Sequence, residues 1–265
     1  MRRTLRALPT LLRIGLAEGV AYRAEMVIWL LSTTMPLVML ALMSAISREA
    51  PIGRFGQADF AAYYLAALVV RLSAGAWVIW EMNFEIRQGT LAYRLLRPIH
   101  PLVAWAASNV GVMPMRWLIT LPILAGGVLA IGAEHFTHDP LLLLLFPVAV
   151  FGGWLITFLA MAVIGSLAFR VDNSTAIFEV WLGLYMLLSG YLLPLEFFPP
   201  WLASATGWLP FRYMLAFPVE LAVGMTSRAQ AAQQLAIQLG WIAVLGVAAI
   251  LAWRAGAKRF GAFGG

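Results

Sequence analysis

The chain alternates long apolar runs with short polar ones, and six of the apolar runs are long enough to cross a lipid bilayer. A spanning helix needs about 20 mainly apolar residues, because the hydrocarbon core is about 30 Å thick and an α-helix rises about 1.5 Å per residue. The six predicted spans are residues 27–46, 60–80, 114–132, 141–168, 176–193 and 233–253. The pattern predicts an all-α membrane protein with a single transmembrane domain over residues 1–265.

The fourth predicted span is the longest, and it contains the adjacent residues Gly152 and Gly153. Such a pair can bend a helix or let a neighbouring helix approach closely. The sequence leaves both explanations open.

Composition agrees with this class of protein. Hydrophobic residues make up 62% of the chain and charged residues 11%, against about 25% charged residues in soluble domains. The formal net charge is +6, which in a membrane protein indicates arginines that mark the cytoplasmic side and not nucleic-acid binding. The absence of cysteine excludes disulfides, thiolate nucleophiles and cysteine metal sites.

The basic residues predict which parts of the chain face the cytoplasm. They gather near both termini and in the loops after the second and fourth predicted spans: Arg2, Arg3, Arg6, Arg13, Arg23, Arg254, Lys258, Arg259, Arg87, Arg94, Arg97 and Arg170. The loop at residues 134–139 has no Lys or Arg. Because basic loops stay inside, we expect both termini and the loop at residues 81–101 to be cytoplasmic.

Residues 1–26 predict an amphipathic helix that lies along the inner leaflet. Leu5, Leu8, Leu12 and Leu16 follow one another at helical spacing, with arginines on another face. The alternative is a basic leader that only sets the topology. Arg13 and Glu18 interrupt the apolar run, so we expect no cleaved signal peptide.

Residues 194–232 predict a region of short helices on the outer face, because prolines divide the apolar pieces. Trp201, Trp208 and Tyr213 would suit the headgroup boundary. A re-entrant gate and an ordinary interfacial cap fit this pattern equally well.

Residues 84–98 form a charged segment between the second and third predicted spans. As one helix, the segment would place Phe84, Leu91 and Leu95 on one face and Arg87 and Arg94 on the next. Gly89 could instead divide it into two pieces. Periodicity alone favours neither a docking element for a soluble partner nor a plain loop that is held inside by its arginines.

A resemblance to a known family bears on this choice. The segment resembles the G-x-L-x-x-x-L-L-R-P pattern of a bacterial permease family, the type-2 (ABC-2) group of ATP-binding-cassette exporters, with Gly89, Leu91, Leu95, Leu96, Arg97 and Pro98 at its fixed positions. The order of spans, the amphipathic first helix and the broken outer hairpin are also similar to that group. Only the short motif is residue-specific.

The resemblance implies that the segment is a coupling helix that sits on an ATPase subunit. It implies an ATPase contact at Glu85, Arg87, Gly89, Tyr93, Arg94 and Arg97. It also implies two permease subunits, identical or related, two ATPases, and a place in the bacterial cytoplasmic membrane. The chain has no phosphate-loop motif, and Lys258 is its only lysine. We therefore expect no cofactor in this chain, with ATP and Mg²⁺ bound by the partner.

Arg71 is the candidate residue for a substrate pathway, because it lies near the middle of the second predicted span. A charge at the bilayer centre costs roughly 2.5 to 3.5 kcal/mol, so it needs a partner, a wet cavity or a function. Structural pairing is the alternative. Arg116 and Glu179 lie near predicted span ends, where snorkelling explains them.

Two other classes of function remain open. A membrane enzyme or scaffold would need no ATPase, although His100, His135 and His138 all fall in loops and build no intramembrane catalytic or zinc site. His135 and His138 with Glu134 and Asp139 could bind a metal outside, but a wet polar loop explains them more simply. An ion-driven carrier would need an acidic relay that the spans lack.

Overall fold

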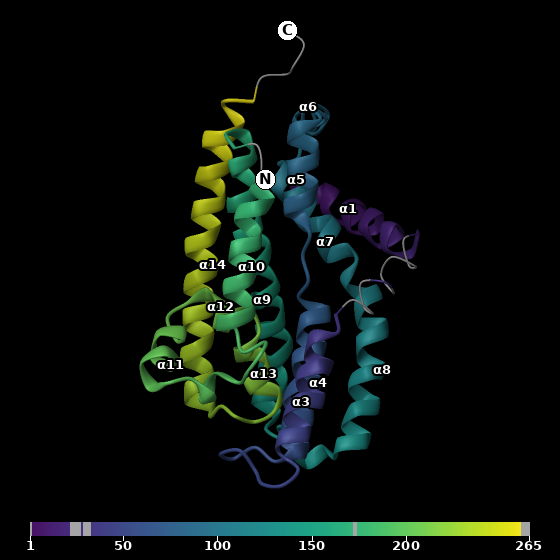
Figure 1. The fold of residues 1–265 in the computed structure, drawn as a ribbon. Helices are drawn as coiled ribbons and strands as arrows, with labels where there is room; N and C mark the ends of the chain where they lie inside the picture. Colours follow the sequence, from purple (N-terminus) through teal and green to yellow (C-terminus); the bar gives the residue numbers. More distant parts are fainter. Residues whose placement is uncertain (1, 22–27, 29–32, 172–173, 261–265) are drawn as a thin grey trace.

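The computed structural model describes residues 2–21, 28, 33–171 and 174–260, and these are almost entirely helical (Figure 1). Apart from one isolated bridge between Ile52 and Phe55, they contain no β-structure. The α-helices are α1 Arg2–Ala21, α3 Met35–Ile46, α4 Gln57–Ser73, α5 Val78–Arg87, α6 Leu91–Leu95, α7 Pro101–Gly111, α8 Met113–Ile131, α9 Pro140–Gly165, α10 Ser174–Leu188, α11 Pro200–Thr206, α12 Pro210–Met214, α13 Ala216–Ala222 and α14 Arg228–Ala257. Short 3₁₀ turns lie at η1 Ala133–His135, η2 Ser166–Phe169 and η3 Leu195–Phe197.

Four helical stretches are long and apolar enough to cross a membrane. They are Gln57–Arg87, Pro101–Ile131, Pro140–Phe169 and Arg228–Ala257, and each covers most or all of one predicted span. The helices in the first and fifth predicted spans are shorter: α3 has 12 residues and α10 has 15. Part of the first predicted span, with the end of the predicted helix 1–26, lies outside the described residues. The count of six spans therefore stays a prediction.

Two span boundaries differ from the sequence prediction. The helical stretch in the second predicted span continues to Arg87 instead of ending at residue 80, and the stretch in the third predicted span begins at Pro101 instead of residue 114. Met82 and Ile86 explain the first difference, because they are buried between helices although charged residues flank them in the sequence. Trp105 is buried as well, in a stretch whose polar residues Ser108 and Asn109 lower the mean hydropathy. A hydropathy window averages over such neighbours and ends the helix too early. The predicted loop 81–101 thus narrows to the short stretch between α5 and α7.

Helix α9 lies at the centre of the bundle, with α5, α12, α13 and α14 packed against it. The glycine pair in α9 lets α12 and α14 pack closely against it. A Cβ atom at Gly153 would lie 2.9 Å from the backbone oxygen of Met214 in α12. Beside Gly152, the amide of Gln238 in α14 donates to the carbonyl oxygens of Ala149 and Tyr213, both at 2.9 Å. Substituents at these positions would push α12 and α14 away.

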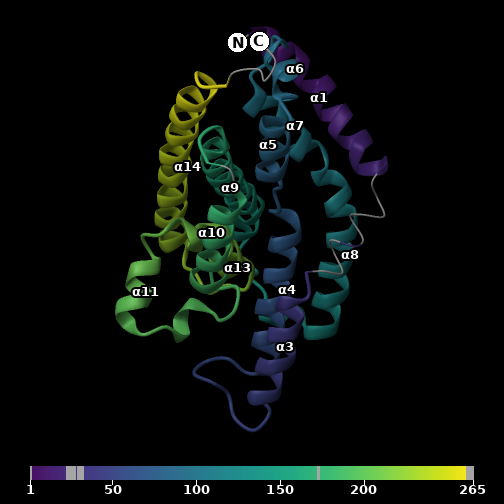
Figure 2. The same ribbon diagram turned by 45° about the horizontal axis from the view of Figure 1, so that its top comes forward.

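Helix α1 slants along the outer edge of the bundle and packs on α7 (Figure 2). The two helices cross at Gly15 and Gly111, where a Cβ atom on Gly111 would lie 2.7 Å from the carbonyl oxygen of Leu12. Leu8 and Leu12 are partly buried, whereas Leu16 is exposed. The position of α1 along a membrane leaflet stays a prediction.

The region before α14 consists of short helices, as its prolines predict. Helices α11 and α12 each begin at a proline, Pro200 and Pro210. Trp201 and Trp208 are 72% and 73% exposed, but Tyr213 is only 1% exposed. The predicted place of Tyr213 at the headgroup boundary is therefore wrong. Its ring packs in the core, and its hydroxyl donates to the carbonyl oxygen of Gly207 at 2.5 Å.

The two ends of the bundle differ in character. Helix α6 and the C-terminal end of α14 lie at one end, at the top of Figure 1, whereas η1 and α11 lie in the lower half. Arg87, Arg97, Arg254 and Lys258 are exposed, and they belong to the upper end. These four of the basic residues that predict the cytoplasmic side thus share one end of the described structure.

Candidate functional site

The segment at residues 84–98 is two helices joined by a turn. Helix α5 ends at Arg87, and α6 begins at Leu91. Gly89 lies between them with a φ of 72°, a left-handed backbone conformation that glycine adopts without steric cost. The break at Gly89 is confirmed, and the single continuous helix is wrong. The predicted common face is lost as well, because Leu91 is fully buried while Phe84 is 64% exposed.

An ion pair holds the two pieces together. The Nε atom of Arg94 in α6 donates to a carboxylate oxygen of Glu85 in α5 at 2.8 Å, and a second guanidinium nitrogen binds the other oxygen. The indole nitrogen of Trp105 in α7 donates to Glu85 at 3.4 Å. The Arg94 guanidinium also lies over the Trp105 ring, 4.9 Å from its centroid. We call these three residues the brace.

The outer surface of the segment is basic and partly apolar. Its exposed residues are Phe84, Arg87, Gln88, Thr90, Tyr93, Leu95, Leu96, Arg97 and Pro98. Tyr93 is 71% exposed and Leu96 is 84% exposed. Among the described residues, neither Arg87 nor Arg97 forms an ion pair. Such a surface leaves charged and aromatic groups available to a partner.

The six predicted contact residues therefore divide into three kinds. Glu85 and Arg94 bind one another within the segment. Arg87, Tyr93 and Arg97 face outward. Gly89 makes the turn that separates α5 from α6.

Aromatic side chains connect the brace to the last helix. The ring of Trp105 packs edge-on against Trp253 of α14, with 5.6 Å between the centroids. Trp253 in turn contacts Phe169 at 5.5 Å and His100 at 5.8 Å. A movement of the segment would thus reach α14 and η2, the 3₁₀ turn that follows α9.

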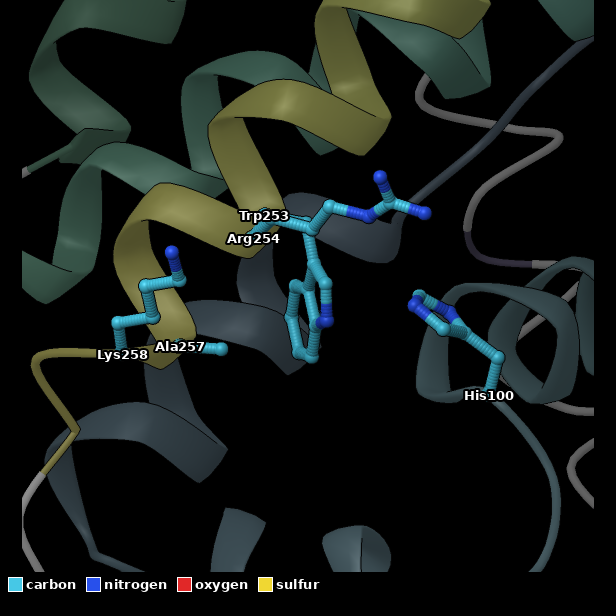
Figure 3. A pocket seen from close by; sticks show the side chains of 5 residues that line it. All are labelled: His100, Trp253, Arg254, Ala257 and Lys258. Atoms are coloured by element: carbon cyan, nitrogen blue, oxygen red, sulfur yellow. The ribbon is translucent and has the colours of Figure 1, made fainter.

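A cavity of about 410 Å³ lies beside this cluster, lined by His100, Trp253, Arg254, Ala257 and Lys258. Figure 3 shows the His100 ring turned toward Trp253 and Arg254 from the opposite wall. Burial lowers the pKa of His100 below its usual value, and the charge of Arg254 adds to this effect. The imidazole is therefore neutral near pH 7.

Arg71 lies away from the segment, in the last turn of α4. Its guanidinium is 5.7 Å from the centroid of the Tyr185 ring and lies close to the hydroxyl of Tyr191. Among the described residues, Arg71 forms no ion pair with a carboxylate.

Arg116 was expected near a span end and lies instead at the middle of Pro101–Ile131. Its guanidinium donates to the backbone oxygen of Gly75 at 2.5 Å and lies 4.8 Å from the centroid of the Trp77 ring. Snorkelling does not describe this side chain, because its contacts hold it at mid-span. The sequence signal was present in the small residues 73–76, which interrupt the apolar second span.

The loop histidines do not gather around a common point. The Nδ1 atom of His135 lies 2.9 Å from a carboxylate oxygen of Asp59, while Asp139 binds Arg228 at 2.6 Å. Within the described residues, no group of three or more His, Asp or Glu side chains is arranged to hold a metal ion.

Comparison with known proteins gives one family. Residues 30–264 match the model of a family described as ABC-2 family transporter protein. The search of curated proteins gave no match.

Proposed function

The chain belongs to the ABC-2 transporter family and is the membrane permease subunit of an ABC transporter, and we propose that it exports substrate with energy from a separate ATPase docked on residues 84–98. The permease itself is a multi-pass membrane protein and not an ATPase. Members of this family act with ABC ATPase subunits.

The observation that carries the proposal is the exposed basic surface of the segment, formed by Arg87, Tyr93, Leu96 and Arg97 at one end of the bundle. An apolar centre with arginine and tyrosine beside it is typical of protein interfaces. The brace supports the same idea, because a docking element must transmit force. Glu85 and Arg94 join α6 to α5, so a movement of α6 reaches the helical stretch Gln57–Arg87 directly.

The mechanism follows from these connections. Closure of the ATPases around ATP would move α6, and the brace would pass the movement to α5 and, through Trp105 and Trp253, to α14. The helices would then repack from an inward-facing to an outward-facing arrangement. In this proposal ATP and Mg²⁺ stay on the ATPase, and no cofactor binds this chain.

The proposed assembly contains two permease subunits, identical or related, and two ATPases in the bacterial cytoplasmic membrane. Both termini and the segment would face the cytoplasm, with lipid around the bundle. Helical stretches with mainly exposed side chains support a second subunit or lipid as neighbour, because only 6% of the apolar window in Pro101–Ile131 is buried.

Co-purification tests the docking surface. The tagged permease is co-expressed with the phosphate-loop ATPase that the proposal expects to be encoded beside it. Arg87→Glu with Arg97→Glu should lower the captured ATPase by about 10-fold or more, since two attractive contacts become repulsive. Arg48→Glu is the matched control, because Arg48 is exposed near the opposite end and its reversal should leave capture unchanged. Equal capture by all three proteins would contradict the docking surface.

Transport by everted and sealed vesicles separates the proposal from its alternatives. An ATP-driven exporter loses activity when ATP is depleted and keeps it when an ionophore collapses the proton gradient. The opposite result indicates an ion-driven carrier. A membrane enzyme or scaffold would show neither dependence and would capture no ATPase.

A further inference from the structure

The helical stretch Gln57–Arg87 is broken at its midpoint. Helix α4 ends at Ser73, residues 74–77 are not helical, and α5 begins at Val78. Figure 1 shows this break at mid-height, beside the junction of α7 and α8. Non-helical backbone at membrane depth is tolerated where it is buried in protein or lines a polar space, and broken helices of this kind commonly form binding sites.

Two arginines flank the break at the same depth. Arg71 and Arg116 each lie close to the midpoint of a 31-residue apolar stretch. Arg116 donates to the carbonyl oxygen of Gly75 within the break, and the charges of the two guanidinium groups interact with one another. Two like charges near the centres of neighbouring apolar stretches are costly unless an anion compensates them.

The described residues supply no such anion. Arg71 contacts the Tyr185 ring and the Tyr191 hydroxyl, and Arg116 contacts a carbonyl and the Trp77 ring. These groups solvate a guanidinium without neutralising it. The nearby carboxylate of Glu81 accepts from the indole nitrogen of Trp77 at 2.5 Å and forms no ion pair with either arginine.

A third donor lies at this depth. Trp154, at the centre of Pro140–Phe169, is 2% exposed, and its indole nitrogen has no hydrogen-bond partner among the described residues. It belongs to the same buried cluster as Ala74 and Val78, which border the break. The N-terminus of α5 lies at the break, and Trp77 gives it no side-chain cap. The positive end of the helix dipole and its free N–H groups therefore lie at the break as well.

The break is also accessible. Arg71, Gly75, Ala76, Trp77 and Arg116 are all partly exposed, with none fully buried. Apolar helix surfaces surround it on the outside of the bundle, including Leu118, which is 68% exposed. A ligand here would meet cationic donors at the break and apolar side chains beside it.

We propose that the break between α4 and α5, with Arg71 and Arg116, binds the anionic headgroup of an amphiphile, a phosphate or a carboxylate that carries an apolar chain. A role of this site in binding the transported substrate rests on the proposed function. Binding of the amphiphile itself does not, because it needs no ATPase.

Binding of dodecyl phosphate to the purified full-length permease in neutral detergent tests the proposal. Calorimetric titration should give saturable binding to the wild-type protein. Arg71→Gln and Arg116→Gln should each raise the Kd by about 10-fold or more, the loss expected for one charge-assisted contact. Arg71→Lys and Arg116→Lys should recover most of the affinity because they keep the charge. Arg48→Gln, far from the break in an exposed loop, should bind as the wild type does.

The chemistry of the ligand is tested with two further probes. Dodecyltrimethylammonium has the same chain with a cationic head and should not compete. Inorganic phosphate has no chain and should bind at least about 10-fold more weakly, since it loses the apolar contacts. If inorganic phosphate bound with the same Kd as dodecyl phosphate, the proposal that the ligand carries an apolar chain would be overturned. Competition by dodecyltrimethylammonium would overturn the proposal that the headgroup is anionic.

A purely structural role for the arginines gives a different result. The glutamine variants would then unfold at lower temperature while the folded fraction bound dodecyl phosphate with unchanged Kd, and this outcome would overturn the proposal. Failure to capture an ATPase, with binding retained, would contradict the exporter and leave the site in place.

Discussion

Arg94 holds Glu85 with two guanidinium nitrogens across the turn at Gly89, and one of these bonds, from Nε, measures 2.8 Å. The pair is largely shielded from water, with side-chain exposures of 25% for Arg94 and 17% for Glu85. A charged pair in such a place fixes geometry more than it adds stability. Removing one partner is nevertheless costly, because the other is left poorly solvated. Its position makes the segment a rigid extension of α5.

Loss of the brace should destabilise the protein. We expect Arg94→Ala to lower the free energy of unfolding by about 2 kcal/mol, since it removes two charge-assisted bonds and the contact with Trp105. Denaturant unfolding in detergent micelles measures this change. Arg97→Ala, in the same segment without an ion pair, should change it by less than about 0.5 kcal/mol. Equal effects of the two variants would contradict the brace.

The turn at Gly89 should not accept a side chain freely. Its φ is 72°, and no atom lies within 4 Å of the place where a Cβ atom would stand. Gly89→Ala should therefore cost about 1 kcal/mol from backbone strain alone, and Gly89→Asn should cost less. The same unfolding measurement applies. The control is Gly183→Ala, in open space within α10, which should be neutral or stabilising because alanine favours helix.

The contact between α9 and α12 should depend on Gly153. A Cβ atom there would lie 2.9 Å from the carbonyl oxygen of Met214, which belongs to the backbone and cannot rotate away. We expect Gly153→Ala to cost about 2 kcal/mol through displacement of α12. Gly126→Ala meets no neighbouring atom in α8, so thermal melting of that variant should match the wild type or exceed it. If Gly153→Ala left the stability unchanged, α12 would have to lie farther from α9 than in the structure.

Acid should weaken the packing around the cavity at His100. Burial and the charge of Arg254 lower the pKa of His100 in the folded state, so the unfolded chain binds a proton more readily. Stability from this group is complete above the ordinary histidine pKa of about 6.5 and falls as the pH drops below it. Melting temperatures between pH 8 and pH 5 measure the loss. In the His100→Gln variant, the part of the fall in melting temperature that protonation of His100 causes should disappear. A variant with the same pH profile as the wild type would contradict this role of His100.

Part of the candidate site was predictable from local patterns. The resemblance motif located the segment, and Gly89 offered a break as one of two structures. The pairing of Glu85 with Arg94 was not predictable, because a left-handed turn changes which side chains meet. Trp105 was missed for a similar reason: it lies beyond Pro98, outside the pattern, and reaches Glu85 only when α7 packs on α5.

The sequence by itself determined the membrane class, the long apolar helices, the basic end and the short helices between prolines, because these depend on composition and on spacing along one chain. Only the tertiary structure decided that Arg116 lies at Gly75 beside Arg71, that Tyr213 is buried, and that Arg94 serves the brace. Such relationships join residues that are distant in sequence, and helix packing sets them. Hydropathy averages over the neighbours of a residue and carries no information about which helix lies across from it.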